Sequence, residues 1–335
     1  MKKINIAVVG ATGMVGRKFL QVLEERKLEA ENYYLYASKN SAGKTVKFMG
    51  KNHTIIELAE KNIKDKKIDI ALFSAGASVS KEFAPYFNEI NCVVIDNSSA
   101  FRRDSNIPLV IPEVNPDDIA KNNGIIANPN CSTIQAVVAL KPLNDAFKIK
   151  RIVYSTYQAV SGAGQGGYSD LKDGITGNPP KKFIYPIFGN LIPHIDVFMD
   201  NGYTKEEDKM IFETRKILHD DNLKITATTV RVPVFHCHSE SINVEFYNPC
   251  PIEEVKRVLK SGKGIVVVDD IKNNIYPMPV TCQDKDEVFV GRIRKDESVD
   301  NGINMWVVAD NIRKGAATNA VQIAQVIIDN LNKHN

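Results

Sequence analysis

Short apolar runs and amphipathic stretches alternate along the first 130 residues. The runs are almost continuously apolar, a pattern typical of strands that are buried on both faces of a parallel sheet. Between the first two runs, residues 15–23 repeat apolar side chains at helical spacing, which predicts one buried helix face. The alternation predicts a βαβ, doubly wound sheet. We expect its strands at Ile4–Val9, Tyr33–Tyr36, Ile68–Phe73, Cys92–Ile95, Leu109–Ile111 and Ile125–Ala127.

The pattern changes beyond residue 150. Candidate strands now follow one another, and two helical stretches, Lys205–His219 and Ile252–Lys260, interrupt them. Such an order is typical of an α+β domain built on a mixed or antiparallel sheet. The last stretch, Ala316–Leu331, is helical again, with an apolar stripe along one face. The strands expected in this second region are Ile152–Tyr157, Ile225–Val234, Ser241–Phe246, Gly264–Val268, Glu287–Arg292 and Ile303–Val308.

The length of 335 residues agrees with two domains, at roughly 150 residues per domain. With 43% hydrophobic and 25% charged residues, the composition is that of an ordinary globular protein. The net charge is only +3, which argues against a nucleic-acid or membrane partner. No apolar run is long enough to span a bilayer, and the chain begins without a signal-peptide pattern, so we expect a cytoplasmic protein.

A glycine-rich turn, Gly10–Gly16, follows the first expected strand and opens the first expected helix. Glycine allows the backbone to approach a phosphate closely, and the amides at a helix N-terminus then bind the anion. In this strand–turn–helix setting, the turn predicts a dinucleotide site. A tight connection that binds nothing is the alternative interpretation.

The residues after the second expected strand bear on the choice of cofactor. An NAD site usually has Asp or Glu there, where the carboxylate binds the ribose hydroxyls. The stretch Ser38–Lys44 has no acidic residue, and its hydroxyls, its amide and Lys39 suit a ribose 2′-phosphate. This composition favours NADP, although a solvated polar loop would have much the same residues.

The chain has five cysteines, an odd number without a Cys-x-x-Cys pair, which argues against a disulfide framework and a structural zinc site. Cys131 differs from the other four because it lies between an expected strand and a helical stretch. At a helix N-terminus, partial positive charge lowers a thiol pKa and favours the nucleophilic thiolate. From these residues alone, a nucleophile and a buried structural cysteine are equally good interpretations.

Two histidines, His236 and His238, flank Cys237. On a strand their side chains would share one face, as two metal ligands do. No further cluster of ligand residues stands nearby in the sequence, so we expect no metal. One histidine acting as the acid–base partner of a distant thiol is the sharper hypothesis, and a structural histidine is its alternative.

Several spaced motifs resemble those of the bacterial aspartate-β-semialdehyde dehydrogenases, and the resemblance covers essentially the full chain. A set of motifs in the correct order is far more specific than any single motif. The motifs are Gly10–Gly16, Asn97–Arg102, Val110–Asn115, Asn128–Thr133, Gln158–Gly164, Glu213–Lys216, Arg231–Val234 with His238, and Ala320–Gln322.

The resemblance implies an α/β fold of the glyceraldehyde-3-phosphate dehydrogenase type with two domains. A Rossmann-type NADP-binding domain would comprise residues 1–130 with 315–335, and an α+β catalytic and dimerisation domain residues 131–314. The implied reaction is the NADPH-dependent reductive dephosphorylation of L-aspartyl 4-phosphate to L-aspartate 4-semialdehyde. It stands at the branch leading to lysine or diaminopimelate, methionine and threonine. The implied assembly is a homodimer.

The resemblance also implies which side chains carry the chemistry, namely Cys131, His238 and Gln158. Cys131 would displace phosphate and form a thioester, because a thiolate attacks an acyl carbonyl readily. His238 would move protons as the sulfur is charged and released. Gln158 would orient the carbonyl or the acyl intermediate.

The implied substrate-binding residues are mostly charged, as a small ionic substrate requires. Arg231 would bind the α-carboxylate, for which a planar guanidinium is well suited. Arg102 and Lys216 would bind phosphate, Glu213 would meet the ammonium group or hold Lys216, and Asn130 would also contact the substrate. By pattern alone, an i, i+3 ion pair on a solvated helix face is the more common interpretation of Glu213 and Lys216.

The implied cofactor contacts come from several parts of the chain. Many relatives have arginine where Asn40 stands, so a cation for the 2′-phosphate is missing there. Either Lys39 compensates or the preference for NADP is relaxed. The implied contacts are Gly10, Thr12, Gly13, Met14, Val15, Asn40, Ser41, Ser74, Gly76, Ser161, Gly162 and Gln322.

Two alternative functions share the fold. N-acetyl-γ-glutamyl-phosphate reductase also uses a cysteine and a histidine on an acyl phosphate, but the Asn130–Thr133 context and the spacing from Arg231 to His238 favour the aspartyl enzyme. A non-catalytic NADP-sensing protein belongs to a different class, and the retention of both Cys131 and His238 argues against it. The stretch 166–201 has no clear period, and we expect it to be an insertion near the dimer interface.

Overall fold

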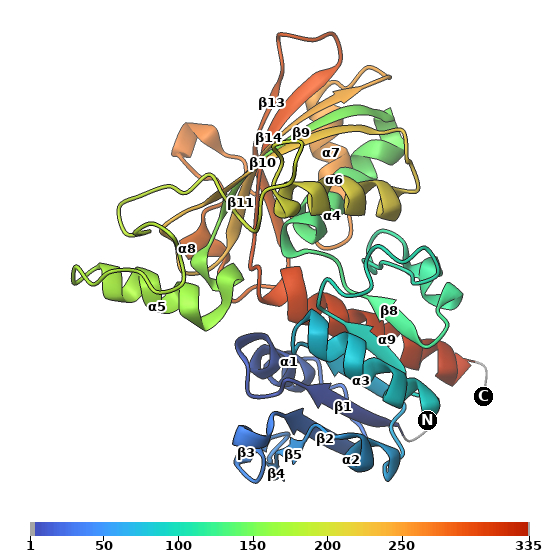
Figure 1. The fold of residues 1–335 in the computed structure, drawn as a ribbon. Helices are drawn as coiled ribbons and strands as arrows, with labels where there is room; N and C mark the ends of the chain where they lie inside the picture. The colour runs from blue at the N-terminus through green and yellow to red at the C-terminus, as the bar shows by residue number, and fades with distance from the viewer. Residues whose placement is uncertain (1–3, 334–335) are drawn as a thin grey trace. The chain divides into compact units, whose positions relative to one another are not determined.

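The computed structural model describes residues 4–333, which form two compact units (Figure 1). Unit 1 comprises the chain up to Pro129 together with the chain from Ala316 onward, and unit 2 comprises Asn130–Gly315. Each unit has its own six-stranded sheet. The C-terminal helix therefore completes the unit that the first strand begins.

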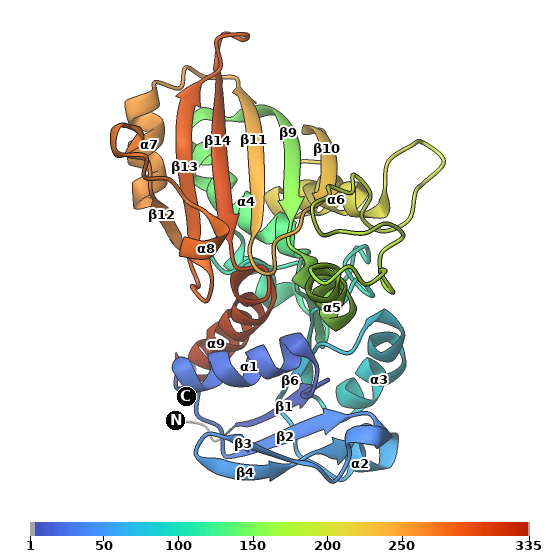
Figure 2. The same ribbon diagram turned by 90° about the vertical axis from the view of Figure 1, so that its left-hand side faces the viewer.

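Unit 1 is a parallel sheet with helices on both faces, which confirms the doubly wound sheet predicted from the alternating pattern. In sheet order its strands are β5 (Ile56–Glu57), β2 (Asn32–Ala37), β1 (Asn5–Val9), β6 (Ile70–Phe73), β7 (Val93–Asp96) and β8 (Ile125–Ala127). One face packs against α1 (Met14–Glu25) and α9 (Thr318–Lys333), the other against α2 (Glu60–Lys64) and α3 (Ala77–Glu89) (Figure 2). Successive strand residues such as Ile6 and Ala7 enter opposite cores.

Two features of unit 1 differ from the expected strands. Residues 109–111 contribute one isolated parallel bridge, from Leu109 to Ala127, rather than a strand. Prolines flank this run, and a proline has no amide for a strand ladder. A hairpin of β3 (Thr45–Phe48) and β4 (Lys51–Thr54) stands where no strand was expected, because its residues are mostly polar.

Unit 2 is built on a mixed sheet, as the succession of strands predicted. In sheet order its strands are β10 (Lys224–Arg231), β9 (Ile149–Gln158), β11 (His238–Phe246), β14 (Gly302–Ala309), β13 (Val288–Lys295) and β12 (Ile265–Val267). The outermost pairs are parallel and the central pairs antiparallel. One face packs against α4 (Cys131–Phe147), α6 (Lys205–Leu218) and α7 (Ile252–Ser261) (Figure 2).

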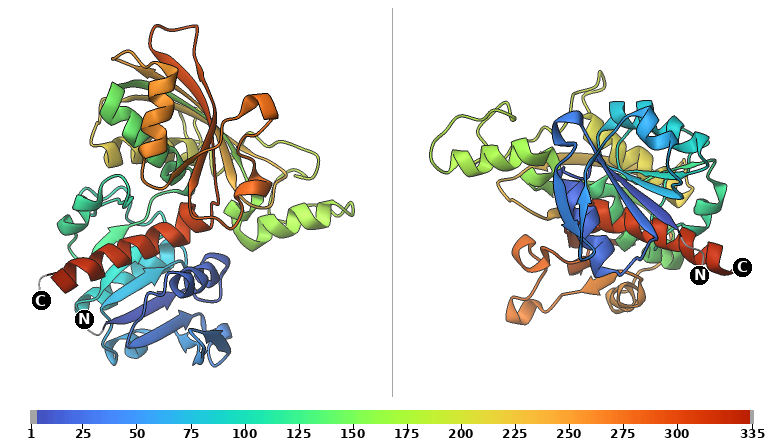
Figure 3. Two further views of the ribbon diagram at one scale, coloured as in Figure 1. Left: turned by 180° about the vertical axis from the view of Figure 1, so that it is seen from behind. Right: turned by 90° about the horizontal axis from the view of Figure 1, so that it is seen from below.

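The stretch expected as an insertion forms α5 (Gly164–Gly174) and a long loop, which extend outward from the sheet of unit 2 (Figure 3). A small apolar core of its own holds this arm together, with Phe183 packed against its edge; its buried members are Val160, Leu171, Ile187 and Ile192. The short helix α8 (Pro279–Cys282) lies near the β13 side of the sheet, away from α5 (Figure 2). On the sheet face opposite α4, the rings of Tyr157 and Trp306 lie 5.4 Å apart.

Candidate active site

The carboxyl ends of β1 and β6 meet where the strand order of unit 1 reverses, which is where open α/β sheets bind ligands. The amide of Ser74 donates to the carbonyl of Val9 at 2.9 Å. Gly10 has a φ of +84°, and a Cβ built on it would lie 2.3 Å from the Ser74 carbonyl oxygen. A Cβ on Gly16 would lie 2.0 Å from the Gly10 carbonyl oxygen. The predicted phosphate-binding turn therefore admits only glycine at these two positions.

Two helices begin at this edge of the sheet without a side-chain cap. Gly13 precedes α1 and Gly76 precedes α3; neither supplies a capping side chain, and neither helix has an acidic residue in its first turn. The first amides of both helices thus remain available to an anion. Met14 and Val15, two of the predicted cofactor contacts, are the first residues of α1. This edge fits the pyrophosphate of a dinucleotide.

The predicted ribose-phosphate residues lie beside the turn. Asn40 and Ser41 belong to a short 3-10 helix that follows β2. The Thr12 hydroxyl donates to the Ser41 hydroxyl at 3.5 Å, so the turn and the 3-10 helix are neighbours. Lys39 and Asn40 are both exposed. The two side chains predicted to determine the preference for NADP or NAD are thus accessible to a ribose bound at this edge.

In unit 2, Cys131 is the first residue of α4, as the helical pattern predicts. The side-chain oxygen of Asn130 caps this helix by accepting the amides of Ser132 at 3.0 Å and Thr133 at 3.4 Å. Glu213, which is 1% exposed, accepts the backbone amide of Asn130 at 2.6 Å. The carboxylate predicted from the resemblance to meet the substrate therefore holds the capping residue next to Cys131.

His238 begins β11, and its Nε2 lies 3.2 Å from the sulfur of Cys131. Its Nδ1 accepts the backbone amide of Ala159 at 3.0 Å. Because Nδ1 is an acceptor, the neutral ring carries its proton on Nε2, facing the sulfur. Burial, and secondly the charge of Arg231, lower the pKa of His238 to about 3. The imidazole is therefore neutral at ordinary pH.

A buried carboxylate that the sequence analysis missed stands beside Asn130 and Gln158. Glu206 is 6% exposed, and its Oε1 accepts Nδ2 of Asn130 at 2.9 Å and Nε2 of Gln158 at 3.1 Å. Nζ of Lys209 lies 3.1 Å from its Oε2. Burial opposes ionisation of Glu206, but the charge of Lys209 and the two amide hydrogen bonds outweigh it and lower the pKa to about 2. The site thus contains a permanent anion.

Glu206 and Lys209 repeat the spacing of Glu213 and Lys216 on the same helix, two turns earlier. Two turns are about seven residues, so both pairs share a helix face. A capping box that starts at Thr204 fixes where this helix begins, and Glu206 and Glu213 both contact Asn130. The repeated Glu-x-x-Lys spacing is the signal that would have found the first pair. Lys216 itself is half-buried on α6.

Arg231 ends β10 and lies next to His238. Its Nη1 donates to the carbonyl of Ala159 at 2.6 Å, so one peptide segment holds both side chains. A Cβ on Gly162 would lie 3.0 Å from Nη1 of Arg231 and 3.2 Å from Nε2 of His238. A side chain at position 162 would therefore intrude on the two groups that the substrate is expected to meet.

Gly315 also approaches the candidate nucleophile. It lies in the π-helical turn Arg313–Ala317, and a Cβ built on it would lie 2.9 Å from Cβ of Cys131. Ser161, a predicted cofactor contact, receives a hydrogen bond at 3.0 Å from Nδ2 of Asn311 just before this turn. π-Helical turns are frequent at functional sites, but no residue pattern identifies them. The sequence therefore held no signal for Gly315.

Two predicted residues of unit 1 have protein partners within that unit. Nη2 of the buried Arg102 donates to the Asn97 carbonyl at 3.0 Å. Nε2 of Gln322, on α9, donates to Glu113 at 2.8 Å. Both side chains are thus held in place by the unit that carries the glycine-rich turn.

The histidine pair does not form the shared strand face that we considered. Cys237 has a φ of +68°, and β11 begins only at His238, so the backbone turns between the two histidines. The ring of His236 lies 5.8 Å from that of Tyr168. Within residues 4–333, no three His, Cys, Asp or Glu side chains gather as a metal site, and no helix is long and apolar enough to cross a membrane.

Two sequence families match the two units. The family described as "Semialdehyde dehydrogenase, NAD binding domain" matches residues 5–122, and the one described as "Semialdehyde dehydrogenase, dimerisation domain" matches residues 140–314. Together with the doubly wound sheet and the Cys131–His238 pair, these matches define a protein of the semialdehyde dehydrogenase class.

Individual relatives narrow the class. An aspartate-semialdehyde dehydrogenase of Aquifex aeolicus is 57% identical, over 97% of this chain and 98% of the relative. A crystal structure of aspartate semialdehyde dehydrogenase II of Vibrio cholerae complexed with ASA matches with a TM-score of 0.94 at 47% identity, over 98% of this chain and 99% of that chain. The chain belongs to the aspartate-semialdehyde dehydrogenase family. A more distant member, from Candida albicans and solved with NADP, matches with a TM-score of 0.74 at 27% identity, over 97% of this chain and 98% of that chain.

Proposed function

We propose that this protein catalyses the NADPH-dependent reductive dephosphorylation of L-aspartyl 4-phosphate to L-aspartate 4-semialdehyde. The observation that carries the proposal is the Cys131 sulfur 3.2 Å from Nε2 of His238 at the start of α4. Arg231 and the anionic Glu206 lie in the same site and complement a small zwitterionic substrate. The product would feed lysine or diaminopimelate, methionine and threonine biosynthesis.

The reaction divides into acyl transfer and reduction at Cys131. The thiolate attacks the acyl-phosphate carbonyl; a carbon–sulfur bond forms, the carbon–oxygen bond to phosphate breaks, and inorganic phosphate leaves. NADPH, when bound, supplies the hydride that reduces the thioester to a thiohemiacetal. Cleavage of the carbon–sulfur bond then releases the aldehyde and restores the thiolate. Each step uses the same sulfur, which explains why a single cysteine suffices.

His238 serves as a hydrogen-bond donor in this mechanism. Its Nε2 proton faces the sulfur, because Nδ1 accepts the Ala159 amide. That proton stabilises the thiolate and then the oxyanion of the tetrahedral adduct. The first-turn amides of Ser132 and Thr133 are occupied by the cap, so we assign the second donor to the free amide proton of Gln158, whose Nε2 also donates to Glu206.

We assign each charged group of the substrate to a different charged side chain of the site. Arg231 binds the α-carboxylate, and Glu206 binds the ammonium group, since its carboxylate stays ionised although it is buried. For the phosphate we keep the cations that the resemblance implies, Arg102 and Lys216, because Lys209 is already held between Glu206 at 3.1 Å and Asp196 at 2.7 Å. Glu213 holds the residue that caps α4, by accepting the backbone amide of Asn130.

Glu206 also separates the proposed activity from the alternative reductase. An N-acetylated substrate has no ammonium group, and an amide in its place would leave the buried carboxylate without a cationic partner on the substrate. A free ammonium group supplies a second cation beside Lys209. The geometry therefore favours aspartyl phosphate over N-acetylglutamyl phosphate.

We assign NADP to the edge of unit 1 where the glycine-rich turn and the 3-10 helix meet. The uncapped amides after Gly13 and Gly76 hold the pyrophosphate. Ser41, Asn40 and Lys39 face the 2′-phosphate. Five free cysteines fit a reducing compartment, and we place the reaction in the cytoplasm.

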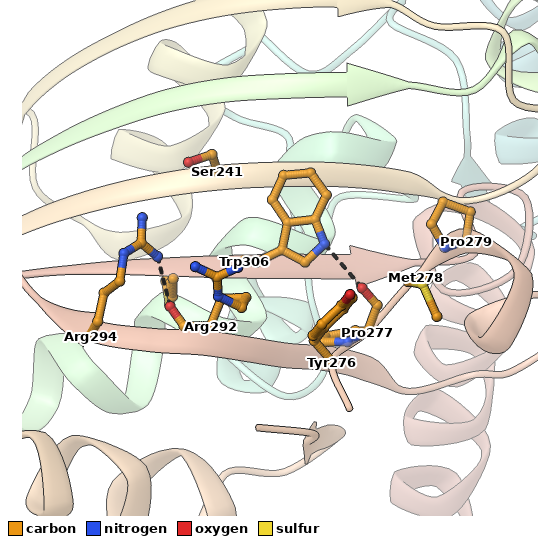
Figure 4. Close-up of a pocket in the computed structure, with 9 residues that line it drawn as sticks. Ser241, Tyr276, Pro277, Met278, Pro279, Arg292, Arg294 and Trp306 are labelled. Carbon is orange, nitrogen blue, oxygen red and sulfur yellow. Dashed lines mark hydrogen bonds between the residues drawn. The ribbon is translucent and has the colours of Figure 1, made fainter. Parts of the chain in front are cut away.

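We further propose a homodimer through the open face of the sheet of unit 2. A pocket of about 300 Å³ indents this face, between Trp306, Arg292 and the 276–279 loop (Figure 4). Nε1 of Trp306 donates to the Pro277 carbonyl at 3.1 Å, which fixes the pocket wall. The face lies within the segment that matches the dimerisation-domain family. Sedimentation should show a dimer that Tyr157→Glu weakens, whereas Tyr247→Glu, also at an exposed tyrosine, should leave it intact.

The proposed reaction is tested in the reverse direction. Purified protein with L-aspartate 4-semialdehyde, phosphate and NADP should form NADPH, and Cys131→Ser should reduce the rate by at least about 10³-fold. Binding of NADP, measured by calorimetry, should survive this substitution. Activity on N-acetylglutamate semialdehyde in place of aspartate semialdehyde would establish the alternative reductase. Tight NADP binding without turnover of either would establish a sensor.

A further inference from the structure

The arm formed by α5 and its following loop contacts the arginine that we assign to the substrate carboxylate. The ring centroid of Phe183 lies 5.9 Å from Cζ of Arg231, within the range of cation–π contacts. Arg231 is 5% exposed. Among the described residues, its Nη1 donates to the Ala159 carbonyl, whereas its buried Nε has no hydrogen-bond partner. The guanidinium thus has one backbone anchor, one aromatic neighbour and at least one unused donor.

The position of Phe183 is fixed by a carboxylate that is remote from the chemistry. Oδ1 of Asp170 accepts the backbone amide of Lys181 at 2.9 Å, and Oδ2 accepts those of Lys182 and Phe183, each at 2.8 Å. Asp170 is 6% exposed. Burial would raise the pKa of Asp170, but the three amide hydrogen bonds outweigh burial and lower it. Three consecutive amides on one carboxylate make a rigid turn.

The helix that carries Asp170 also leaves room for the ring. A Cβ built on Gly167 would lie 3.0 Å from Cζ of Phe183, and one on Gly166 would lie 3.3 Å from Cβ of Lys182. The ring therefore lies close against the backbone of α5. The Asp170 carboxylate and the backbone of α5 both hold Phe183, which leaves it little freedom to move away from Arg231.

We propose that Phe183 is a positioning residue for Arg231, that Asp170 holds it in place, and that the two together determine how strongly the enzyme selects substrates with an α-carboxylate. A bidentate contact requires the guanidinium plane at a defined angle, and an aromatic face beside it restricts that angle. The inference rests on the proposed function, because Arg231 acts here as the carboxylate-binding residue.

Selectivity for the carboxylate provides the readout. Wild-type enzyme is assayed with L-aspartate 4-semialdehyde and with 3-aminopropanal, which is the same aldehyde without the carboxylate. Phe183→Leu and Asp170→Asn should each raise KM for the first substrate about tenfold and leave kcat within about twofold. Their kcat/KM for 3-aminopropanal and their affinity for NADP should not change.

Matched variants separate positioning from folding. Phe183→Tyr keeps the ring and should restore the wild-type preference, and Phe188→Leu, at an exposed phenylalanine of the same arm, should not alter it. In a double-mutant cycle, Phe183→Leu should have little further effect on KM once Arg231→Lys is present. Additive effects, or equal losses on both aldehydes, would show that the arm is merely structural and overturn the inference. If wild type does not turn over aspartate semialdehyde at all, the proposed function fails instead.

Discussion

Each unit has a candidate site of its own, and the two sites are built by different means. In unit 1 the cofactor edge consists of backbone: Gly10 at a close approach to Ser74, and two helix N-termini without capping side chains. In unit 2 the site consists of side chains, and Cys131 and His238 meet from distant parts of the chain. We therefore expect the first site to be most sensitive to substitution of glycine, and the second to the loss of single charges.

Among substitutions that keep Cys131, the largest effect is expected at the charges of unit 2. Glu206→Gln keeps the shape and an acceptor for Asn130 but removes the anion that we assign to the substrate ammonium group. We expect kcat/KM to fall about 100-fold, since a charged hydrogen bond is worth about 1.5–3 kcal/mol. Steady-state kinetics on aspartate semialdehyde provides the measurement.

Glu213→Gln is the matched control on the same helix. Its amide oxygen still accepts the Asn130 amide, so the cap of α4 persists and kcat/KM should fall by less than about tenfold. If Glu213→Gln is instead the more damaging change, the substrate meets the second Glu-x-x-Lys pair, as the sequence resemblance implied, and our assignment of Glu206 is wrong.

The next effect concerns the backbone site. Gly10→Ala places a Cβ 2.3 Å from the Ser74 carbonyl oxygen at a φ of +84°. We expect unit 1 to lose about 2 kcal/mol or more of stability and NADP affinity to fall with it. Thermal unfolding and calorimetry measure the two. Gly43→Ala, also at positive φ but with open space around it, measures the cost of backbone strain alone. An equal loss of stability there would show that the close contact of Gly10 with Ser74 is not the cause.

The same difference between a backbone site and a side-chain site explains how much of each the sequence predicted. The turn Gly10–Gly16 and the cap before Cys131 are local, so residue types in order revealed both. Our assignment of Glu206 rather than Glu213 to the ammonium group is not local, because both carboxylates contact Asn130 and only the structure distinguishes the backbone contact from the side-chain contact. The contact of Gly315 with Cys131 joins distant segments through a π-helical turn, and no spacing rule predicts it. The polar β3–β4 hairpin was not predicted either, because it has no apolar run that would indicate a strand.

A smaller effect is expected from pH. The pKa of His238 is about 3 in the folded chain and about 6.5 in an unfolded one. Above pH 6.5 both states are neutral and the histidine contributes no pH dependence. Below it the unfolded chain binds a proton that the folded chain does not, so this residue lowers stability by about 1.4 kcal/mol per pH unit. Glu206, with a pKa of about 2, adds its own dependence only below about pH 4.5.

Urea unfolding of wild type and of His238→Gln between pH 6.5 and pH 5 therefore measures the contribution of His238 to the free energy of unfolding. Trp306, the only tryptophan, lies in unit 2 and reports its unfolding by fluorescence. Wild type should lose stability across this interval more steeply than His238→Gln. His238 should also cause no limb near pH 6.5 in the kcat/KM profile. The profile of wild type and that of the residual activity of His238→Gln should therefore have the same shape near this pH. Equal slopes for both proteins would mean that the imidazole is not buried in its neutral form.

The smallest effect is expected for cofactor selectivity, at the exposed side chains beside the glycine-rich turn. Asn40→Arg places a guanidinium on the exposed 3-10 helix whose Ser41 contacts the Thr12 hydroxyl. If this edge holds the ribose, the selectivity for NADP over NAD should rise about tenfold, because arginine binds the 2′-phosphate in two places. The ratio of kcat/KM with the two cofactors measures it. Lys39→Met should lower the same ratio if Lys39 already supplies the cation, and in that case the gain from Asn40→Arg shrinks. Were neither substitution to change the ratio, side chains here would not read the ribose, and the cofactor would be recognised through the backbone of Gly10–Gly16 alone.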